Sequence, residues 1–453
     1  MTSAEKTSTF YDLGLDKNIL APLEASGITS PFPIQELAIP LAYQGNDLIA
    51  QARTGTGKTY AYGLPSLQRL LDHEPALNDE GIRLARLLIL VPTRELAIQV
   101  AKDLTDSARQ SGLNILTVYG GVRYEDQIRS LQAGVDIVVG TVGRIVDLYH
   151  KDELILSEVS TVVLDEADEM LDLGFLDDVE RILTLVANPH QTLLFSATMP
   201  QQILALARTH LNHPIHVRAE SHDAQATVPD IDQFVYQAHE LDKPEILGKL
   251  AQSESCVKMM IFTRTKRSAQ HLADELSDRG FSSAAIHGDL HQSARERTLK
   301  KFRNGKVKIL VATDVAARGI DVEDLSHVVN YEVPDDPQQY VHRIGRTGRA
   351  QRQGTAVTLI DWQDITRWKG INNALNLPYS EPVETYSTSD HLFTDLNIDP
   401  NVKGRLAIGR MRQSKEKRQS PRRTQVDSTR PSRTKRTRIR RKNGQIVSRS
   451  ETE

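Results

Sequence analysis

The sequence predicts an α/β protein with two tandem parallel-sheet domains and a basic, disordered C-terminal tail. Short apolar runs alternate with amphipathic stretches over about 360 residues, a pattern typical of parallel sheets with helices on both faces. The alternation stops once, in the polar stretch at residues 220–232 that contains Pro229, and then resumes. With 453 residues, 39% of them hydrophobic and 25% charged, the chain is long enough for such domains.

The apolar runs predict the strands in order along the chain. Before the polar stretch they lie at residues 47–50, 87–91, 115–119, 137–140, 162–165 and 191–195, with helical patterns such as 94–109 and 175–186 between them. After it they lie at 258–262, 283–286, 309–312, 327–331 and 356–360, followed by a short helical segment at 365–375 and an irregular stretch. We therefore expect a first domain at 1–218, a linker at 219–232, a second domain at 233–362, an extension at 363–400 and a tail at 401–453.

The tail differs from the rest in composition and charge. Residues 401–453 contain no Phe, Trp or Tyr, so we expect disorder there. They hold 18 Lys and Arg against 4 Asp and Glu, a formal charge of +14, whereas the first 400 residues carry −17. An acidic body with a basic tail indicates a polyanionic partner, the alternative being a solvated tail that keeps the protein soluble.

Several protein classes are excluded or disfavoured by composition. A single cysteine, Cys256, excludes an intrachain disulfide framework and a zinc site built from several cysteines. The first ten residues are polar, unlike a secretory signal, and no apolar run approaches the roughly 18 residues of a membrane span. We therefore expect a soluble cytoplasmic protein without a membrane partner.

A glycine-rich motif, ARTGTGKT at residues 52–59, follows the first strand and leads into a helix. Glycines let backbone N–H groups surround phosphate oxygens at a helix N-terminus, which already favours anions. Lys58 would neutralise the β- and γ-phosphates, and the Thr59 hydroxyl would bind Mg²⁺. The alternative is a plain glycine turn. The predicted phosphate-binding residues are Ala52, Arg53, Thr54, Gly55, Thr56, Gly57, Lys58 and Thr59.

Acidic residues come directly after the strand at 162–165, where an open α/β sheet places its ligands. Asp165 would hold Mg²⁺, usually through its waters, and Glu166 would orient or deprotonate the water that attacks the γ-phosphate. The alternative is a set of acids that complement the dipole of the next helix. The catalytic interpretation is favoured, because these acids follow the glycine-rich motif within the same alternation of strands and helices.

The second domain contains HRIGRTGR at residues 342–349. An arginine directed at the γ-phosphate stabilises transition-state charge and raises hydrolysis by roughly 10³–10⁵. The three arginines could instead form a solvated basic stripe or contact a phosphate.

Taken together, these motifs resemble those of DEAD-box ATP-dependent RNA helicases over roughly residues 10–360. The ordered set also includes GITSPFPIQ at 27–35, PTRELA at 92–97, Gly120-Gly121, TVGR at 141–144, SAT at 196–198, QSAR at 292–295, Thr313-Asp314 and ARGID at 317–321. The resemblance implies two RecA-like domains of the P-loop NTPase type, with ATP and Mg²⁺ as cofactors. The chain departs from the family pattern at Ile28, Phe32 and Val142.

The resemblance also assigns roles to individual residues. Gln35 would read the adenine edge, Phe10 would stack on the base, and Asp321 would contact the ribose. Lys58, Asp165 and Glu166 would be catalytic, with Arg346 and Arg349 as arginine fingers. Asp168, Ser196, Thr198 and His342 would couple the ATP site to RNA. The RNA backbone would be contacted by Thr93, Arg94, Gly121, Thr141, Arg144, Arg264, Arg295 and Thr313, without sequence preference and with 2′-OH contacts that favour RNA over DNA.

We therefore expect an RNA-stimulated ATP hydrolase that separates short RNA duplexes locally or remodels RNA–protein complexes. The alternative is an ATP-gated RNA clamp or assembly factor with little unwinding, which the same motifs would serve. A DNA-directed or transport ATPase is less well supported. The expected partners are single-stranded or short duplex RNA and proteins of ribosome assembly or RNA decay, with the chain itself a monomer. The tail would add salt-sensitive RNA affinity.

Overall fold

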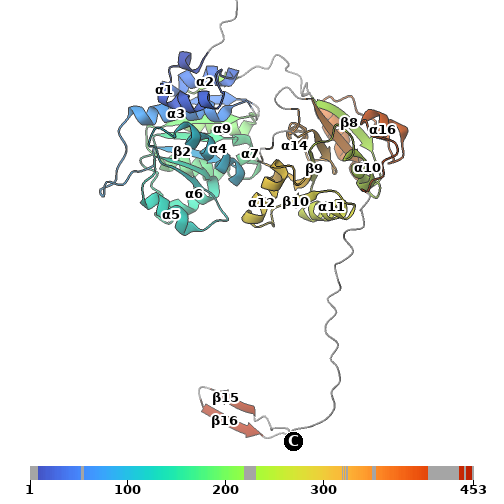
Figure 1. Ribbon diagram of the computed structural model, residues 1–453. Coiled ribbons are helices and arrows are strands. Elements are labelled where there is room, and N and C mark those ends of the chain that lie inside the picture. Colours follow the sequence, from blue (N-terminus) through green and yellow to red (C-terminus); the bar gives the residue numbers. More distant parts are fainter. Residues whose placement is uncertain are drawn as a thin grey trace, which may run out of the picture. The chain divides into compact units, whose positions relative to one another are not determined.

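The computed structural model describes residues 9–52, 56–218, 231–318, 320, 322, 325–348 and 353–406 (Figure 1). It also gives the backbone of two short strands at 438–442 and 445–450. Residues up to Leu406 form one compact unit by their contacts, and those from Ala407 onward form another.

The first sheet has seven parallel strands in the order β3-β4-β2-β5-β6-β1-β7. Its strands are β1 (Leu48–Gln51), β2 (Leu87–Val91), β3 (Ile115–Val118), β4 (Ile137–Thr141), β5 (Thr161–Asp165), β6 (Gln191–Ser196) and β7 (Ile215–Arg218). Every residue of β2 and β5 is buried, and alternate residues face opposite sides: Ile89 belongs to one hydrophobic core and Leu88 to the other. Central strands buried on both faces explain why they read as continuous apolar runs.

Helices cover both faces of this sheet (Figure 1). One core contains residues of the first four α-helices and the other contains residues of the next five. On the first face lie the short 3-10 helix η1 (Phe10–Leu13), α1 (Lys17–Ala25), α2 (Pro33–Tyr43), α3 (Lys58–Asp72) and α4 (Arg94–Ser107). On the second face lie α5 (Tyr124–Gln132), α6 (Val142–Tyr149), α7 (Ala167–Asp172), α8 (Leu176–Leu185) and α9 (Gln201–His210).

The second sheet repeats this architecture, with the parallel order β10-β11-β9-β12-β13-β8-β14. Its strands are β8 (Ile231–Gln237), β9 (Met259–Thr263), β10 (Ser283–Ile286), β11 (Ile309–Thr313), β12 (His327–Asn330), β13 (Gly354–Ile360) and β14 (Val383–Glu384). One face packs on α10 (Lys243–Leu250), α11 (Lys266–Asp278) and α16 (Asp390–Asp395). The other packs on α12 (Gln292–Arg303), α13 (Asp314–Ala317), α14 (Pro337–Ile344) and α15 (Ile365–Ala374).

The predicted fold class, two parallel-sheet α/β domains, is confirmed, and the predicted strands match β1–β6 and β9–β13 to within one or two residues at each end. Three strands of these two sheets were not predicted. β7 and β14 lie at sheet edges, and β8 begins at Ile231, inside the range predicted as linker. The domain boundaries stay predictions.

The segment after β13, predicted to be mostly irregular, packs against the second sheet. Leu392 of α16, Leu396 and Ile398 are at most 4% exposed and belong to one of its cores. The chain stays attached as far as Leu406, whose N–H donates a 2.9 Å hydrogen bond to the carbonyl of Arg279. The body therefore extends a few residues past 400.

Within the tail, β15 (Arg438–Lys442) and β16 (Gln445–Ser450) pair antiparallel. The described tail residues thus form a short hairpin, a local structure that the sequence pattern did not predict. In the part of the chain that the structure describes, no helix is both long and apolar enough to cross a membrane.

Candidate nucleotide and nucleic-acid site

The predicted functional residues of the first domain line the carboxyl edge of its sheet. Parallel strands end at the same edge, so the residues that follow neighbouring strands become neighbours. In the sheet order β4-β2-β5-β6-β1, the residues at or just after the strand ends are Thr141, Thr93, Asp165, Ser196 and Ala52. Five motifs that lie far apart in the sequence therefore meet at one edge.

Lys58 and Asp165 form the buried centre of this edge. Their side chains are 7% and 4% exposed, and Lys58 Nζ lies 3.9 Å from Asp165 Oδ1. Among the described residues, neither atom has a hydrogen-bond partner. Buried charged groups are normally hydrogen-bonded, so two facing orphans of opposite sign fit a site that receives a charged ligand. Phosphate oxygens suit the ammonium, and Mg²⁺ suits the carboxylate.

Tyr62 holds the other oxygen of Asp165. Its hydroxyl donates a 2.8 Å hydrogen bond to Asp165 Oδ2, and its ring packs edge-on against Phe195 of β6 at 5.2 Å between centroids. Burial, the nearby charge of Asp165 and this hydrogen bond raise the pKa of Tyr62 well above its usual value. Sequence reasoning missed Tyr62, although it lies one helical turn after Lys58 on the same helix.

Asp165 and Glu166 are both buried carboxyls. Burial raises the pKa of Asp165, against the opposing effects of Lys58 and Tyr62. Burial raises the pKa of Glu166 to about 7, with Lys58 opposing and Asp165 adding to the shift. Glu166 also has a left-handed backbone, φ 56°, at the start of α7. A carboxyl whose pKa is near 7 can exchange a proton close to neutral pH.

Gln35 connects the start of α2 to the glycine-rich loop. Its Oε1 accepts a 2.8 Å hydrogen bond from the N–H of Phe32, and its Nε2 donates a 2.9 Å hydrogen bond to the carbonyl of Gly57. Gly57 has φ +77°, and a Cβ there would come within 2.3 Å of Gln35 Nε2 and 2.9 Å of the Phe32 ring. Only glycine fits this position, and the substitution at Phe32 places an aromatic ring beside the loop.

The other predicted nucleotide residues differ in what the structure says of them. Phe10 is 3% exposed and belongs to the hydrophobic core of the first domain, so its observed role is packing and adenine stacking stays a prediction. Thr59 lies next to Lys58 in the first turn of α3 and hydrogen-bonds with Tyr62. Five predicted residues lie outside the described ones: Arg53, Thr54, Gly55, Asp321 and Arg349.

The predicted coupling residues Asp168, Ser196 and Thr198 form one hydrogen-bonded unit. Asp168 Oδ2 accepts from the N–H of Thr198 at 2.9 Å and from its hydroxyl at 2.8 Å, while the N–H of Asp168 donates to Ser196 Oγ at 3.2 Å. Gln338 of α14 donates a 2.8 Å hydrogen bond to the Thr198 hydroxyl. This unit of the first domain thus contacts a helix of the second.

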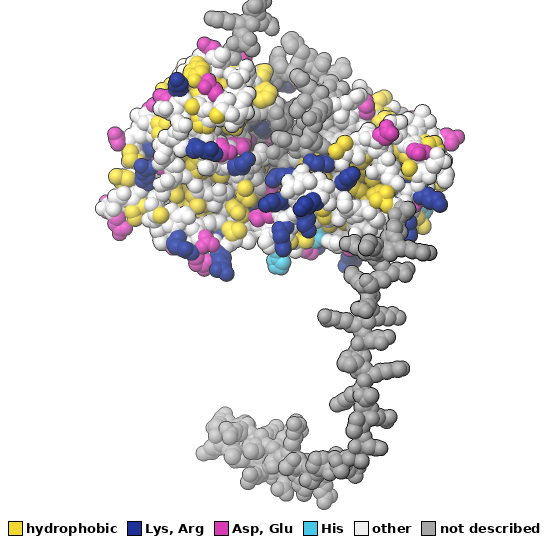
Figure 2. All heavy atoms as spheres, viewed as in Figure 1, with side chains coloured by type: hydrophobic (Ala, Val, Ile, Leu, Met, Phe, Trp, Pro, Cys, Tyr) yellow, Lys and Arg dark blue, Asp and Glu magenta, His cyan; other side chains and the backbone are white. Residues whose placement is uncertain are grey.

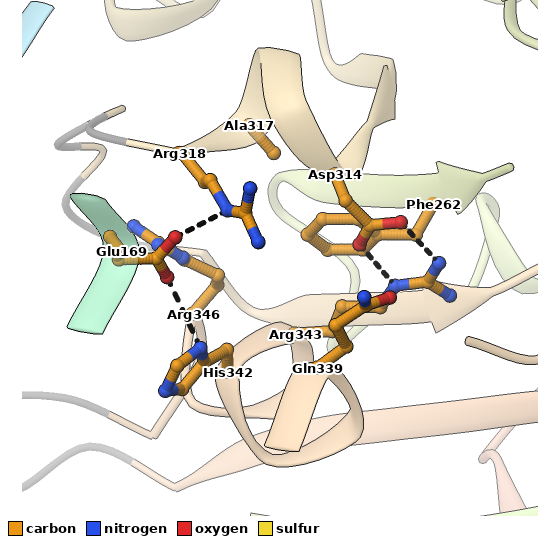
Figure 3. Close-up of a pocket in the computed structure, with 9 residues that line it drawn as sticks. All are labelled: Glu169, Phe262, Asp314, Ala317, Arg318, Gln339, His342, Arg343 and Arg346. Atoms are coloured by element: carbon orange, nitrogen blue, oxygen red, sulfur yellow. Dashed lines mark hydrogen bonds and ion pairs between the residues drawn. The ribbon is translucent and has the colours of Figure 1, made fainter. Parts of the chain in front are cut away.

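Glu169 pairs with two basic side chains of the second domain. Together with Arg318, His342 and Arg346 it lines the pocket in Figure 3. It pairs with Arg318 Nε, and its Oε1 lies 3.2 Å from His342 Nδ1. Burial would raise the pKa of Glu169, but His342, Arg318 and Arg346 together hold it below its usual value. The charge of Arg346 also lowers the pKa of Glu166, against the larger effect of burial.

The arginines of HRIGRTGR have different surroundings. Arg343 is 2% exposed and binds Asp314 with two hydrogen bonds, of 2.6 and 2.7 Å. It also donates to Asn330 and to the carbonyl of Glu332, so its role is to fix α14 against the sheet. Arg346 donates a 3.3 Å hydrogen bond to the carbonyl of Ile320 and lines the pocket.

Three of the predicted RNA residues of the first domain come together at one loop. A Cβ on Gly121 would lie 2.5 Å from Arg94 Nη1, and one on Gly120 would lie within 4.0 Å of both Arg94 and Arg144. Arg144 is 6% exposed, donates to Gln127 and lies over the Tyr124 ring at 3.9 Å, so it supports this loop from beneath. Thr93 and Thr141 are the residues before α4 and α6, where Thr93 caps its helix.

The predicted RNA residues of the second domain lie at the carboxyl edge of its sheet. Arg264 follows β9 and pairs with Asp364 at 2.9 Å, and Thr313 ends β11. Arg295 of α12 binds Glu95 of the first domain and the carbonyl of Ala316. On the same helix, Gln292 accepts a 3.1 Å hydrogen bond from Arg94. The first turn of α12 therefore meets the start of α4.

Comparisons with known proteins agree with this arrangement. The DEAD/DEAH box helicase model matches residues 32–206, and the helicase conserved C-terminal domain model matches residues 242–351. The DEAD-box ATP-dependent RNA helicase CshA of Bacillus cereus is 44% identical over 364 residues, covering 80% of this chain and 67% of the relative. The chain belongs to the DEAD/DEAH box helicase family. CshA of Bacillus subtilis is 43% identical over 354 residues, covering 78% of this helicase and 70% of the relative.

Solved structures share the fold of this DEAD/DEAH box helicase. Dbp5 of Saccharomyces cerevisiae bound to RNA and ADP BeF3 matches with a TM-score of 0.74 and 29% identity, over 86% of this chain and 98% of that one. A truncated Mss116p bound to single-stranded RNA and AMP-PNP matches with a TM-score of 0.74 and 26% identity, over 87% and 83%. The predicted pair of RecA-like domains is thus confirmed.

Beyond Tyr62, sequence reasoning gave no role to Glu169 and Gln338 of the helicase. Glu169 lies in the first turn of α7, where acids are common, and Gln338 lies in the first turn of α14. Their function depends on contacts between domains, which no local spacing reveals. One sequence feature could have indicated a role for Glu169. It is an acid directly after Asp168, next to the acids that were expected to face arginines of the second domain.

Proposed function

We propose that this protein is an ATP-dependent RNA helicase, which couples ATP binding and hydrolysis to RNA binding and to local separation of short RNA duplexes. One observation carries the proposal. Lys58 and Glu166 of the first domain, which are proposed to bind phosphate and orient water, share one edge with Glu169, and Glu169 is bound by Arg318 and His342 of the second domain. A site divided between two domains can change their affinity for one another when it fills.

ATP and Mg²⁺ are the proposed cofactors, and the residues present fit them. Lys58 would bind the β- and γ-phosphates, and Asp165 and Thr59 would hold the metal. In the described residues no group of three or more His, Cys, Asp or Glu side chains could by itself hold a metal ion. That suits Mg²⁺, which is usually bound by one or two carboxylates together with substrate phosphates and water. The bound ion would neutralise charge that develops on the phosphates.

Two further side chains supply the proposed chemistry. Glu166 would orient the attacking water and accept its proton, a role suited to a buried carboxyl whose pKa lies about 7. Arg346, which lines the same pocket as Glu169, would stabilise the negative charge of the transferred phosphoryl group. Arg349 is proposed to assist it.

RNA is the proposed second ligand, held by Thr93, Arg94, Gly121, Thr141, Arg144, Arg264, Arg295 and Thr313. The contacts between Arg94 and Gln292 and between Arg295 and Glu95 support this role, because they bring two of these residues to the junction of the domains. The solved Dbp5 and Mss116p structures with bound RNA support it further. Protein partners in ribosome assembly or RNA decay, a monomeric state and a cytoplasmic location stay predictions.

The test compares wild-type protein with Glu166→Gln in two assays, RNA-stimulated ATP hydrolysis and release of a short RNA duplex. We expect Gln at 166 to reduce hydrolysis by at least about a hundredfold, because it removes the proton acceptor, while ATP and RNA still bind. Glu158→Gln, an exposed position in the first domain, is the control. Unchanged hydrolysis in Glu166→Gln would reject the role of Glu166. Hydrolysis by wild-type protein that retains its RNA duplex would favour the clamp alternative.

A further inference from the structure

The exposed face of α12 and the turn after it carry a dense group of cations. Residues 297–308 contain six Lys and Arg and no Asp or Glu, in a body whose first 400 residues have a formal charge of −17. Figure 2 shows dark blue side chains gathered over α12 and β10. We call this group the α12 basic face; its members are Arg297, Lys300, Lys301, Arg303, Lys306 and Lys308.

The fold forces these side chains outward. Leu299 and Phe302 of α12, at 4% and 0% exposed, pack in the core under the sheet, together with Val307. A helix that buries one stripe presents its remaining positions to solvent, and all six cations are exposed. The basic face is therefore a fixed feature of the second domain.

Four of the six charges of this face belong to lysines. Among the described residues, no carboxylate lies within ion-pair distance of Lys300, Lys301, Lys306 or Lys308. Elsewhere some exposed cations do have acidic partners, as Arg109 has Asp106 and Arg129 has Asp126. Adjacent unpaired cations repel one another, and a bound polyanion would relieve that repulsion while releasing its own counterions.

We call the eight residues proposed to hold RNA the proposed RNA groove, and the face begins beside two of its contacts with the first domain. The first turn of α12 carries Gln292 and Arg295, which contact Arg94 and Glu95 of the first domain. From there the helix extends for 12 residues, about 18 Å at 1.5 Å per residue. The cations thus continue in one direction from residues already proposed to contact RNA.

The opposite end of the face leads toward the start of the tail. A surface pocket there is lined by Lys258, Gly305, Lys308 and Val402, among others. Just beyond Val402 the chain is fixed, because Gln252 Nε2 donates a 2.6 Å hydrogen bond to the carbonyl of Lys403 and Glu245 accepts a 2.7 Å hydrogen bond from the N–H of Gly404. Cations therefore extend from the groove to the residues that precede the basic tail.

We propose that the α12 basic face binds the phosphate backbone of RNA that extends beyond the groove. The inference rests on the proposed RNA-helicase function. The face has no aromatic side chain, so it would contact phosphates without stacking bases and would not read sequence. It anchors the flank of a long RNA while the groove acts on the adjoining segment.

The test uses the full chain and two RNAs. The short RNA has roughly 8 nucleotides, which is within the usual site size of single-strand-binding folds, and the long RNA has about 25 nucleotides. The variant combines Lys300→Gln, Lys301→Gln, Lys306→Gln and Lys308→Gln. The matched control combines Lys102→Gln, Arg181→Gln, Arg208→Gln and Lys369→Gln, four exposed cations on other helices. Binding is measured over a salt series, with ATP hydrolysis and thermal unfolding alongside.

We expect the α12 variant to lose at least about tenfold in affinity for the long RNA at low salt, and its salt slope to fall by about 3, near 0.7 for each lost phosphate contact. Affinity for the short RNA, ATP hydrolysis without RNA and the unfolding midpoint should match the control. The long RNA, but not the short one, should also protect residues 297–308 from hydrogen exchange.

Each other outcome overturns a defined claim. If wild-type protein shows RNA-stimulated hydrolysis but the α12 variant binds the long RNA like the control, the inference is wrong, and the face suits an acidic protein instead. Equal losses for short and long RNA would place the face inside the groove and also reject the inference. Hydrolysis by wild-type protein that no RNA stimulates would reject the proposed function itself.

Discussion

Tyr62 and Asp165 are joined by a buried 2.8 Å hydrogen bond from the phenol hydroxyl to Oδ2 of the carboxylate. The bond leaves Oδ1 facing Lys58 Nζ at 3.9 Å. A carboxylate has two equivalent oxygens and can rotate, so a fixed donor on one of them determines where the other points. We infer that Tyr62 is a positioning residue for the proposed metal-binding oxygen.

Replacing Tyr62 with Phe tests this arrangement. Tyr62→Phe keeps the ring against Phe195 but leaves Asp165 Oδ2 buried without its donor. We expect the rate of ATP hydrolysis to fall about tenfold, which corresponds to about 1.4 kcal/mol, and half-maximal activity to need more Mg²⁺. Nucleotide affinity measured at several Mg²⁺ concentrations provides a readout independent of turnover. The control is Tyr60→Phe, a half-buried tyrosine on the same helix; if both variants show the same Mg²⁺ dependence, Tyr62 is only a packing residue.

Thr198→Val should separate ATP hydrolysis from strand separation. The change removes the hydroxyl that donates to Asp168 Oδ2 and accepts from Gln338 of the second domain, both at 2.8 Å. The N–H of Thr198 still binds Asp168, so we expect hydrolysis without RNA within about twofold of wild type, and duplex release reduced about tenfold or more. Thr209→Val, an exposed position on α9, controls for the loss of a hydroxyl. Parallel losses in both activities would contradict a coupling role.

The contact between His342 and Glu169 should weaken as pH rises. Burial lowers the pKa of His342, but its hydrogen bond to Glu169 and the charges of Glu169 and Asp168 outweigh this and leave the pKa above its usual 6.5. A group whose pKa is raised by folding stabilises the folded state fully at a pH below its unfolded pKa. That stabilisation is lost as the pH rises through its folded pKa. The pKa of Glu169 is lowered from 4.5, so its carboxylate stays ionised over the whole pH range in which His342 loses its proton.

The distance between the domains, measured by fluorescence resonance energy transfer, reports on the contact between His342 and Glu169 and needs no ATP hydrolysis. Burial raises the pKa of Cys256, the chain's one cysteine, to about 12, so dyes should react selectively with cysteines introduced at Lys102 and Lys369. We expect the fraction with the two dyes close together to fall as pH rises from 6.5 through the raised pKa of His342. His342→Gln should remove this dependence, and His150→Gln, at an exposed position, should retain it. A pH dependence that survives in His342→Gln would assign it to another group.

The central strands were predicted well because a strand buried on both faces is a continuous apolar run in the sequence. In Leu87–Val91, for example, every residue is apolar and buried. The edge strands β7 and β14 escaped prediction because each is short and largely exposed, with no continuous apolar run. β8 was missed altogether: Ile231 and Asp232, at its start, follow a polar stretch and look like its continuation.

The site could be predicted to the extent that its residues sit in local motifs. Lys58, Asp165 and Thr198 each follow a recognisable strand end, and the structure brings Lys58 and Asp165 together. Tyr62, Glu169 and Gln338 could not be assigned, because each acts through a partner more than 100 positions away. Gln35 shows the intermediate case: its motif was recognised, but its hydrogen bond to Gly57 depends on how α2 packs against the glycine-rich loop.

The tail should contribute RNA affinity that is separable from the body, provided that it is removed at the right residue. A chain ending at Leu406 keeps the hydrogen bonds of Gly404 with Glu245 and of Leu406 with Arg279, and loses most of the 18 Lys and Arg found after residue 400. We expect its RNA dissociation constant to rise at least about tenfold at low salt and its salt slope to become shallower. A chain ending at Pro400 should bind similarly but unfold at a lower temperature, since the Glu245 carboxylate then loses a buried partner. Fluorescence anisotropy over a salt series, with thermal unfolding of both truncations, measures this; an unchanged slope would make the tail a solubility element.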